Sequence, residues 1–462
     1  MATSPANPEG APGRRPDRAQ EPSPVKGEGV PARPVRPRTK SARGSRDGKP
    51  APRARRIPAR TTAALLACAL AATACAAGPA ATHQARPTAR PANPTGVALP
   101  QIPASRREHV PSALYGTMLY GPAAPGLPRL PPPLVNLANI MPGGPPPDGI
   151  PAIDHPRFLR PAQVNFLSAS EPVLALQIGA DARAYPVQIL IWHEIVNDTV
   201  GGVPVAVTYC PLCNTAIAYD RRAAGRVLSF GTSGLLYDSN LLMYDRQTQS
   251  LWVQFTGQAV AGVLIRHQLR SYPMQTVSWG AWRAGHPHGW VLSRDTGYTR
   301  PYGSNPYPGY DNIHSPPFLF SGQVNGRYAA KTRLVGIRYR GAAVAVLLTT
   351  LRRRRVIDLT IAGHPVTVWW QPGTASALSS GTIAGGADVG ATGAFSPVVD
   401  GRRLHFLPAA GGFRDRETGS HWSVLGHANA GPLTGQNLAR VPHMDTFWFV
   451  WAAFRPHARV VS

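Results

Sequence analysis

The chain has 462 residues and 43% of them are hydrophobic, which is enough for two or three domains with real cores and excludes a small disulfide-rich scaffold. The formal net charge of +25 usually points to nucleic acid, but only four of the 48 basic residues are lysine and +10 of the charge lies in residues 1–60. That Pro-rich segment cannot bury enough apolar surface to fold, so we expect a disordered basic leader and no nucleic acid partner.

Residues 61–77 have the pattern of a signal peptide. An uncharged run, "TTAALLACALAATA", follows several arginines, and its 14 residues fall short of the roughly 20 that a membrane-spanning helix needs. The small residues before Cys75 resemble the lipobox of bacterial lipoproteins, in which the cysteine is acylated. We therefore expect an exported protein, either anchored to the membrane by a lipid on Cys75 or secreted after cleavage near Ala77.

Residues 78–150 are dominated by Pro, Ala, Gly and Thr. This composition is typical of an extended tether that spaces a folded unit from a membrane or wall.

An internal repeat follows the tether. "GGVPVAVTYCP" from Gly201 matches "AGHPVTVWWQP" from Ala362, and Trp252 pairs with Trp422 at a similar shift. Residues 171–293 and 333–462 are therefore predicted to be two copies of one domain. The predicted units are a first repeat at 151–293, a connector at 294–332 and a second repeat at 333–462.

Short runs rich in Val, Leu, Tyr and Trp alternate with Gly, Asp and Asn turns within each copy, which favours strands. Helical spacing occurs only at 184–191 and 277–284. We expect a mainly β fold with minor α, that is α+β, formed by tandem duplication. The first copy has predicted strands at 173–178, 203–209, 216–219, 226–230, 241–244 and 251–255.

The duplication separates residues needed for packing from residues needed for chemistry. Asp245, Arg246 and Trp252 recur in the second copy, so we interpret them as structural, with the Asp-Arg dipeptide in a turn or a repeated ion pair. Three features do not recur: the pair Cys210 and Cys213, the stretch Trp192, His193 and Glu194, and the polar loop 231–240. Their joint absence suggests that they work together in the first copy.

The cysteine pair leaves three alternatives open. Cys210 and Cys213 can be a reactive redox couple, because a disulfide across so short a loop is strained and oxidising. They can also bind copper or zinc together with His193 and Glu194. The third alternative is an inert pair in a surface interaction protein. In either active form we expect support from Trp192, Asn214, Ser233, Asp238 and Asn240.

The segments "WHEIVNDTVGGVPVAVTYCPLCNTAIAYDR", "FGTSGLLYDSNLLMYDRQTQSLW" and "SRDTGYTRPYG" resemble an uncharacterised family of exported bacterial and archaeal proteins that is known only as a domain of unknown function. The resemblance covers residues 150–462 and implies no established activity.

The resulting hypothesis is a thiol-type oxidoreductase. Cys210 and Cys213 would exchange disulfides with a protein or small-molecule redox partner, and His193 would lower the pKa of the attacking thiol. This function needs no cofactor, whereas the metal alternative needs copper or zinc.

Overall fold

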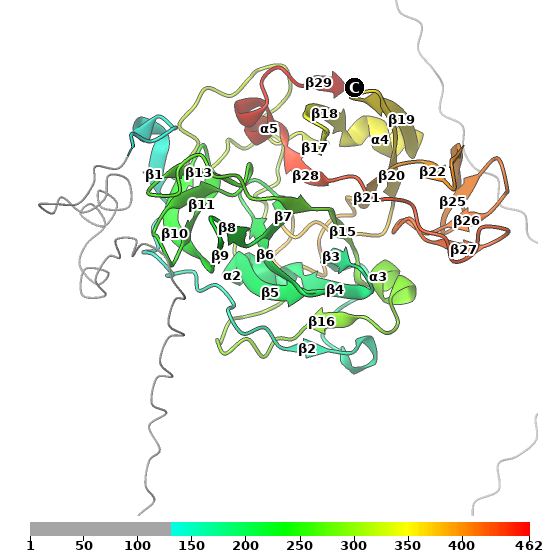
Figure 1. Cartoon of the computed structure of the whole chain (residues 1–462), viewed down its shortest axis with the longest axis horizontal. Helices are drawn as coiled ribbons and strands as arrows, with labels where there is room; N and C mark the ends of the chain where they lie inside the picture. The colour runs from blue at the N-terminus through cyan, green and yellow to red at the C-terminus, as the bar shows by residue number, and fades with distance from the viewer. Residues whose placement is uncertain (1–130) are drawn as a thin grey trace, which may run out of the picture. The chain divides into compact units, whose positions relative to one another are not determined.

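A computed structural model describes residues 131–462, and the leader, the signal peptide with Cys75 and the first part of the tether lie outside the described residues. The described chain is mainly β and contains four short α-helices (Figure 1). The expected mainly β fold with minor α is confirmed. No helix within residues 131–462 is long and apolar enough to cross a membrane.

The first repeat is built from short strands, two helices and tight turns. In chain order its elements are β3 (Pro172–Ile178), β4 (Asp181–Pro186), α2 (Val187–His193), β5 (Ile195–Val200), β6 (Val203–Cys210), β7 (Thr215–Asp220), β8 (Arg222–Ala223), β9 (Arg226–Val227), β10 (Phe230–Tyr237), β11 (Asn240–Asp245), β12 (Leu251–Val253), β13 (Gln258–Ala261), β14 (Ser271–Tyr272), β15 (Met274–Ser278), α3 (Trp279–Gly285) and β16 (Trp290–Leu292).

The second repeat has a closely similar series. Its elements are β17 (Arg333–Tyr339), β18 (Ala342–Leu347), α4 (Leu348–Arg354), β19 (Val356–Ile361), β20 (His364–Gln371), β21 (Ala391–Phe395), β22 (Val398–Val399), β23 (Arg402–Arg403), β24 (Phe406–Ala409), β25 (Gly412–Asp415), β26 (His421–Trp422), β27 (Ala428–Ala430), β28 (His443–Phe447), α5 (Trp448–Phe454) and β29 (Arg459–Val461).

The two repeats have the same strand order. One sheet runs β15-β3-β4-β16 in the first repeat and β28-β17-β18-β29 in the second, and the last pair is parallel in both. The strands β7-β6-β5 correspond to β21-β20-β19, and β10-β11-β12-β13 correspond to β24-β25-β26-β27. A register shift next to Trp252 has its counterpart next to Trp422. Residues 171–293 and 333–462 therefore share these strand orders.

Asp245 has the structural role expected from its recurrence. Its carboxylate accepts hydrogen bonds from the Thr248 backbone and from the indole N–H of Trp252 at 3.0 Å. Asp415 accepts the same bonds, with the Trp422 indole at 2.9 Å. A buried carboxylate held by three or more donors fixes a turn in each repeat.

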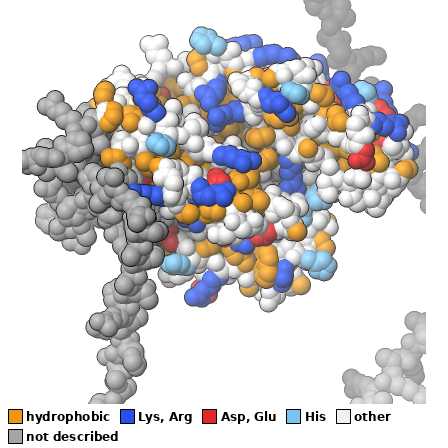
Figure 2. Space-filling view, in the orientation of Figure 1, with side chains coloured by type: hydrophobic (Ala, Val, Ile, Leu, Met, Phe, Trp, Pro, Cys, Tyr) orange, Lys and Arg blue, Asp and Glu red, His pale blue; other side chains and the backbone are white. Residues whose placement is uncertain are grey.

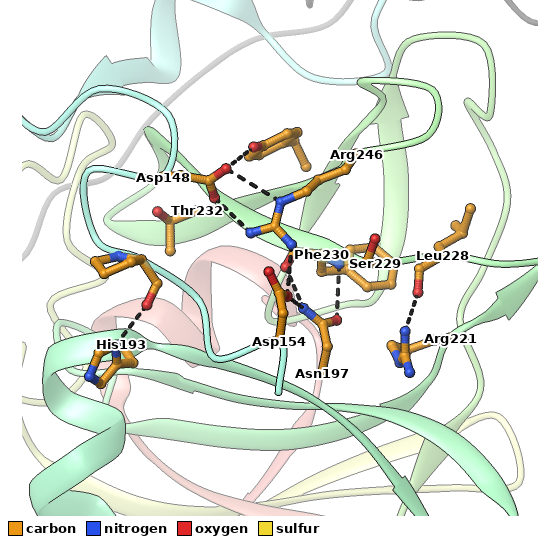
Figure 3. Close-up of polar contacts among 12 residues, drawn as sticks. Asp148, Asp154, His193, Asn197, Arg221, Leu228, Ser229, Phe230, Thr232 and Arg246 are labelled. Carbon is orange, nitrogen blue, oxygen red and sulfur yellow. Dashed lines mark hydrogen bonds and ion pairs between the residues drawn. The ribbon is translucent and has the colours of Figure 1, made fainter. Parts of the chain in front are cut away.

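Arg246 does not form a repeated ion pair. Its guanidinium binds Asp148 at 3.1 Å and Asp154 at 2.8 Å, and Asn197 donates to Asp154 at 2.7 Å (Figure 3). The equivalent Arg416 is exposed and forms no ion pair in the described chain. The turn is therefore common to both repeats, whereas the ion pairs attach the segment before residue 171, where the matching of the two copies begins.

That segment enters the fold earlier than the sequence predicts. Strand β1 (Ile140–Pro142) pairs with β10, so the described end of the predicted tether is part of the folded unit. Strand β2 (Phe158–Leu159), within the predicted first repeat, pairs with β16. The Pro-rich composition does not predict β1. This strand is a short edge strand that pairs with a sheet formed by other strands, and edge strands tolerate proline.

Two predicted local structures differ from the fold. Strand β4 occupies the start of the predicted helix 184–191, because pairing with β3 overrides helical spacing, and α2 begins only after Pro186. The predicted loop 231–240 is largely strand β10. A bulge between Thr232 and Leu235 accommodates its turn-type residues, and Gly234 has a positive φ of 78° where the carbonyl of Pro145 comes close.

The repeats share a core. Trp279 and Trp282 of α3 are buried in one cluster with Trp369 and Trp422 of the second repeat. The Gln275 side chain donates to the backbone of Thr392 and Val424, at 3.2 and 3.1 Å. Apolar burial on this scale, with several tryptophans, makes the two repeats one packed unit.

The connector 294–332 contains no helix or strand and runs over both repeats. Its backbone is hydrogen-bonded to the second repeat at Gly381 and Leu378, and the Ser239 hydroxyl of the first repeat donates to the carbonyl of Phe318 at 2.5 Å. Arginines and lysines are spread among apolar and neutral side chains on the face drawn in Figure 2, without forming one continuous basic stripe.

Candidate functional site

The two cysteines lie in the turn between β6 and β7. Cys210 is the last residue of β6 and pairs with Thr215 of β7, and the turn closes through the N–H of Asn214, which has a left-handed φ of 51°. Both thiols are free, and Cys210 and Cys213 are only 1% and 0% exposed. A reactive pair needs at least one sulfur within reach of its partner, and in this state both sulfurs are buried.

Polar groups from the β10–β11 turn surround the sulfurs. The carbonyl of Ser239 lies 3.4 Å from Cys213 Sγ and 3.9 Å from Cys210 Sγ. The Asn240 amide donates to Cys213 Sγ at 3.4 Å. The part of the 231–240 segment that was predicted to accompany the cysteines is therefore adjacent to them.

A buried chain of hydrogen bonds fixes the orientation of Asn240. Its amide also donates to the Gln254 side-chain oxygen at 3.0 Å, and Gln254 in turn donates to Thr208 at 2.9 Å. The Asn240 oxygen accepts the N–H of Phe255. Because the oxygen is used in this way, the N–H groups of Asn240 are directed at Gln254 and at the sulfur.

The two thiols ionise at different pH. Burial raises the pKa of Cys210, but hydrogen bonds from the Cys213 side chain and from the N–H groups of Leu241, Cys213 and Leu212 outweigh it and leave that pKa below its usual value. Burial and then the neighbouring Cys210 raise the pKa of Cys213 well above its usual value. Cys210 is therefore the thiol that ionises first.

Glu194 is the carboxyl group of the site. It caps the C-terminus of α2 with a left-handed φ of 59°, and the equivalent Arg355 has φ 67°, so this backbone shape belongs to the fold. Glu194 is 7% exposed, and burial followed by the charge of Cys210 raises the pKa of its carboxyl well above 4.5. The sequence suggested Glu194 only as a metal ligand; the structure places a buried carboxyl with a raised pKa near Cys210.

His193 has other partners. Its Nδ1 donates to the carbonyl of Pro151 at 2.7 Å (Figure 3), and its Nε2 therefore accepts from the Tyr302 hydroxyl at 2.6 Å. Burial lowers the pKa of His193, so the ring is neutral at neutral pH. With both ring nitrogens engaged, His193 has no free nitrogen to direct at the sulfurs.

The residues suggested for a metal do not fit one. No group of three or more His, Cys, Asp or Glu side chains in residues 131–462 is placed to hold a metal ion. Zinc needs about four converging ligands, and His193, one of the four suggested, is bound elsewhere. A copper ion at this place would have only the two cysteine sulfurs as ligands from the suggested residues.

The other supporting residues act mainly on local structure. Trp192 donates to the carbonyl of Ser304, Ser233 Oγ donates to the carbonyl of Leu242 within the bulge, and Asp238 accepts from Ser321. Asn214 Oδ1 accepts weakly from Tyr209, at 3.4 Å. None of these four side chains has a hydrogen bond to sulfur in the described structure, in contrast to Asn240.

Two tyrosines of the connector lie near the site and were not singled out from the sequence. Burial and the nearby Glu194 and Cys210 raise the pKa of Tyr307, and burial together with both cysteines raises that of Tyr310. The carbonyl of Tyr310 accepts from Lys331, whose ammonium also lies over the ring. The four tyrosines between residues 298 and 310 of the connector were the only signal in the sequence.

Comparison with known proteins gives a family but no activity. Neither the curated proteins nor the solved structures include a match. A family model described as a protein of unknown function, DUF3179, matches residues 147–458. That span includes the first repeat, the connector, all but the last four residues of the second repeat and every residue of the site. The chain belongs to the DUF3179 family.

Proposed function

We propose that this protein is an exported thiol–disulfide redox protein whose reactive pair is Cys210 and Cys213. The observation that carries the proposal is the hydrogen bonding of Cys210, first by the Cys213 thiol and then by the backbone N–H groups of Leu241, Cys213 and Leu212, which lowers the Cys210 pKa although the residue is buried. Stabilisation of a thiolate is what a nucleophilic thiol requires, and a structural cysteine has no need of it. The free state of both thiols makes this the reduced form.

The reaction transfers two electrons and two protons. The Cys210 thiolate attacks one sulfur of a substrate disulfide; the substrate S–S bond breaks, and the first thiolate leaves and takes a proton. Cys213 then loses its proton and attacks Cys210 Sγ, which forms the Cys210–Cys213 disulfide and releases the second substrate thiol. The substrate is reduced and the protein is oxidised.

Glu194 is suited to move the second proton. A carboxyl whose pKa is raised by burial is a stronger base than an exposed one. When Cys210 is held in the mixed disulfide, its negative charge no longer disfavours the carboxylate. Glu194 can then accept the Cys213 proton and pass it to the departing thiolate.

Access to the sulfurs requires movement of their cover. The β10–β11 turn and the connector lie over the pair, joined by the bond from Ser239 to Phe318. Asp238 and Ser239 both have positive φ, at 48° and 64°, so the turn is a strained segment. We assign the opening step to this turn and to the connector residues that contact it.

The direct test is a redox titration of the full chain with Cys68 and Cys75 replaced by serine, so that only the proposed pair can react. In glutathione buffers we expect a reversible two-electron transition, abolished by Cys210→Ser and by Cys213→Ser. Mixed disulfide with a substrate should accumulate in Cys213→Ser, in which the resolving thiol is absent.

Metal analysis of the same protein separates the alternatives. A stoichiometric copper or zinc content that is lost with Cys210→Ser, without any redox transition, would support the metal-binding module instead. Thiols that neither oxidise reversibly nor bind metal would leave a structural pair in a surface interaction protein, and the redox proposal would be abandoned.

We propose the cellular location of the protein from its N-terminal sequence. The pattern around Cys75 supports export and lipid anchoring. Cells grown with labelled fatty acid should label the wild type, and Cys75→Ser should lose the label. Equal labelling of both would refute the anchor and leave plain secretion.

The duplication is also our inference. Equal strand orders, equivalent bulges and equivalent Asp–Trp bonds in residues 171–293 and 333–462 support it. In this interpretation the second repeat has kept the fold and lost the thiol site, with Gln371 at the position of Cys210 and Arg355 at that of Glu194.

A further inference from the structure

Two adjoining hollows lie between the repeats and include none of the thiol-site residues. One has a volume of about 290 Å³ and is lined by Gln177 and Pro273 of the first repeat and by Leu438 and Arg440 of the second. The other, of about 500 Å³, also contains Gln177 and is lined mainly by residues 180–182 and 285–290, with His427 from the second repeat. We call the two together the inter-repeat cleft.

Three basic side chains meet in this cleft. The rings of His286 and His427 are packed edge to face, with centroids 5.0 Å apart. The Arg440 guanidinium lies 3.3 Å from Nε2 of His427. His286 is 9% exposed, and the other two side chains are half-buried. One nitrogen of His427 thus faces a cation that comes from the same repeat.

No carboxylate in the described chain is paired with these three groups. The only acidic residue that lines the cleft is Asp181, and its oxygens accept hydrogen bonds from Arg183 and from the N–H of Gly201. The remaining polar side chains are Gln177, which donates to the carbonyl of Gly179, the exposed His288 and Asn437. Among the described residues that line the cleft, Arg440 is therefore a charged group without an acidic partner.

This arrangement is costly without a counter-ion. Burial lowers the pKa of Arg440 to about 10. Burial and the neighbouring cations lower the pKa of His286 to about 3 and that of His427 to about 4, so both rings are neutral at neutral pH. The half-buried guanidinium of Arg440 has only the neutral His427 ring as its side-chain partner in the described chain, so the desolvation of its charge is offset only in part.

We propose that the inter-repeat cleft binds a small molecule through its oxyanion group, a carboxylate or phosphate, held by Arg440, His286 and His427. The planar guanidinium suits two oxygens of such a group. Leu425, Leu438 and Pro273 offer apolar contacts to the rest of the ligand. A metal ion fits the cleft poorly, because the guanidinium would repel it from His427.

Calorimetric titration of the full chain with inorganic phosphate, and separately with acetate, tests the site at constant ionic strength. We expect saturable binding of at least one of the two anions, and the stronger one identifies the preferred group. Binding should be accompanied by proton uptake, because an adjacent anion raises the pKa of both histidines. Titrations in two buffers of different ionisation enthalpy measure that uptake.

Arg440→Gln should weaken binding about tenfold or more, since it removes a charge-assisted hydrogen-bond donor. Arg353→Gln, at an exposed arginine of α4, is the matched control and should leave affinity unchanged. If Arg440→Gln does not fold, His427→Gln is the second test, and we expect this variant to take up fewer protons when it binds the anion. No saturable binding in the wild type, or equal affinity in Arg440→Gln or His427→Gln, would overturn the proposal. Since the thiols are not involved, redox activity and anion binding can fail independently.

Discussion

The hydroxyl of Thr446 donates a hydrogen bond to the backbone carbonyl of Cys213 at 3.0 Å, and both residues are fully buried. Thr446 lies on β28 of the second repeat, 233 positions further along the chain. The turn that holds the second cysteine is thus supported by the repeat that has no cysteine. The thiol site consequently depends on the packing of both repeats.

Thr446→Val should destabilise the protein and loosen this turn. Valine matches threonine in shape but leaves the Cys213 carbonyl without its buried donor, which costs about 1–3 kcal/mol of unfolding free energy. Urea unfolding measures the loss, and Thr349→Val, at an exposed threonine of α4, should change stability by less than about 0.5 kcal/mol. Equal stability of Thr446→Val and wild type would show that the hydroxyl is dispensable.

Asn240→Ala should raise the pKa of Cys213 further. The side-chain amide of Asn240 is a hydrogen-bond donor that lowers the pKa of this thiol, against the larger effect of burial. The pH dependence of alkylation, measured in a Cys210→Ser background, should move to higher pH. Asn312→Ala, at an exposed asparagine of the connector, serves as the control. An unchanged profile in Asn240→Ala would mean that the amide does not contact the ionised sulfur.

Glu194→Gln should make stability less dependent on pH. In the folded protein the pKa of Glu194 is raised well above 4.5, so the unfolded chain loses this proton at lower pH than the native one. Unfolding is therefore favoured increasingly as pH rises above about 4.5, and glutamine removes that loss. Urea unfolding should give Glu194→Gln the higher stability at about pH 7, with a smaller difference at about pH 4.

The same substitution bears on mechanism. If Glu194 moves the proton of Cys213, Glu194→Gln should slow formation of the Cys210–Cys213 disulfide from the mixed disulfide. The initial attack by Cys210 should be less affected. Slowing of both steps to the same degree would point to a general disturbance of the turn.

Arg246→Gln should cost about 1–3 kcal/mol of unfolding free energy, because its guanidinium joins Asp148 and Asp154 ahead of the first repeat to the turn after β11. Arg416→Gln changes the equivalent residue of the second repeat, which is exposed, and should be nearly neutral. Chemical denaturation of Arg246→Gln and Arg416→Gln compares the loss of unfolding free energy for the same substitution at equivalent positions of the two repeats. Equal losses would contradict the contacts in Figure 3.

Sequence periodicity and the internal repeat predicted the strands that have strong apolar character. Strands β3, β6, β7 and β11 lie within about one residue of their expected ranges. The structural role of Asp245 and Trp252 also followed from their recurrence, and the equivalent bonds in both turns account for it. Of the two alternatives for the Asp-Arg dipeptide, the turn occurs in both copies and the repeated ion pair does not, because Arg246 finds its acidic partners before residue 171, where the matching of the two copies begins.

The sequence by itself determined the strand pattern and the place of the cysteines at the end of β6, because these depend on residues close together in the chain. Only the tertiary structure decided which polar groups reach the sulfurs. Asn240 and Ser239 come from another hairpin and Thr446 from the other repeat, whereas His193, although near in sequence, turns to Pro151 and Tyr302. Spacing along the chain does not specify where side chains of different strands converge, since sheet packing fixes that geometry.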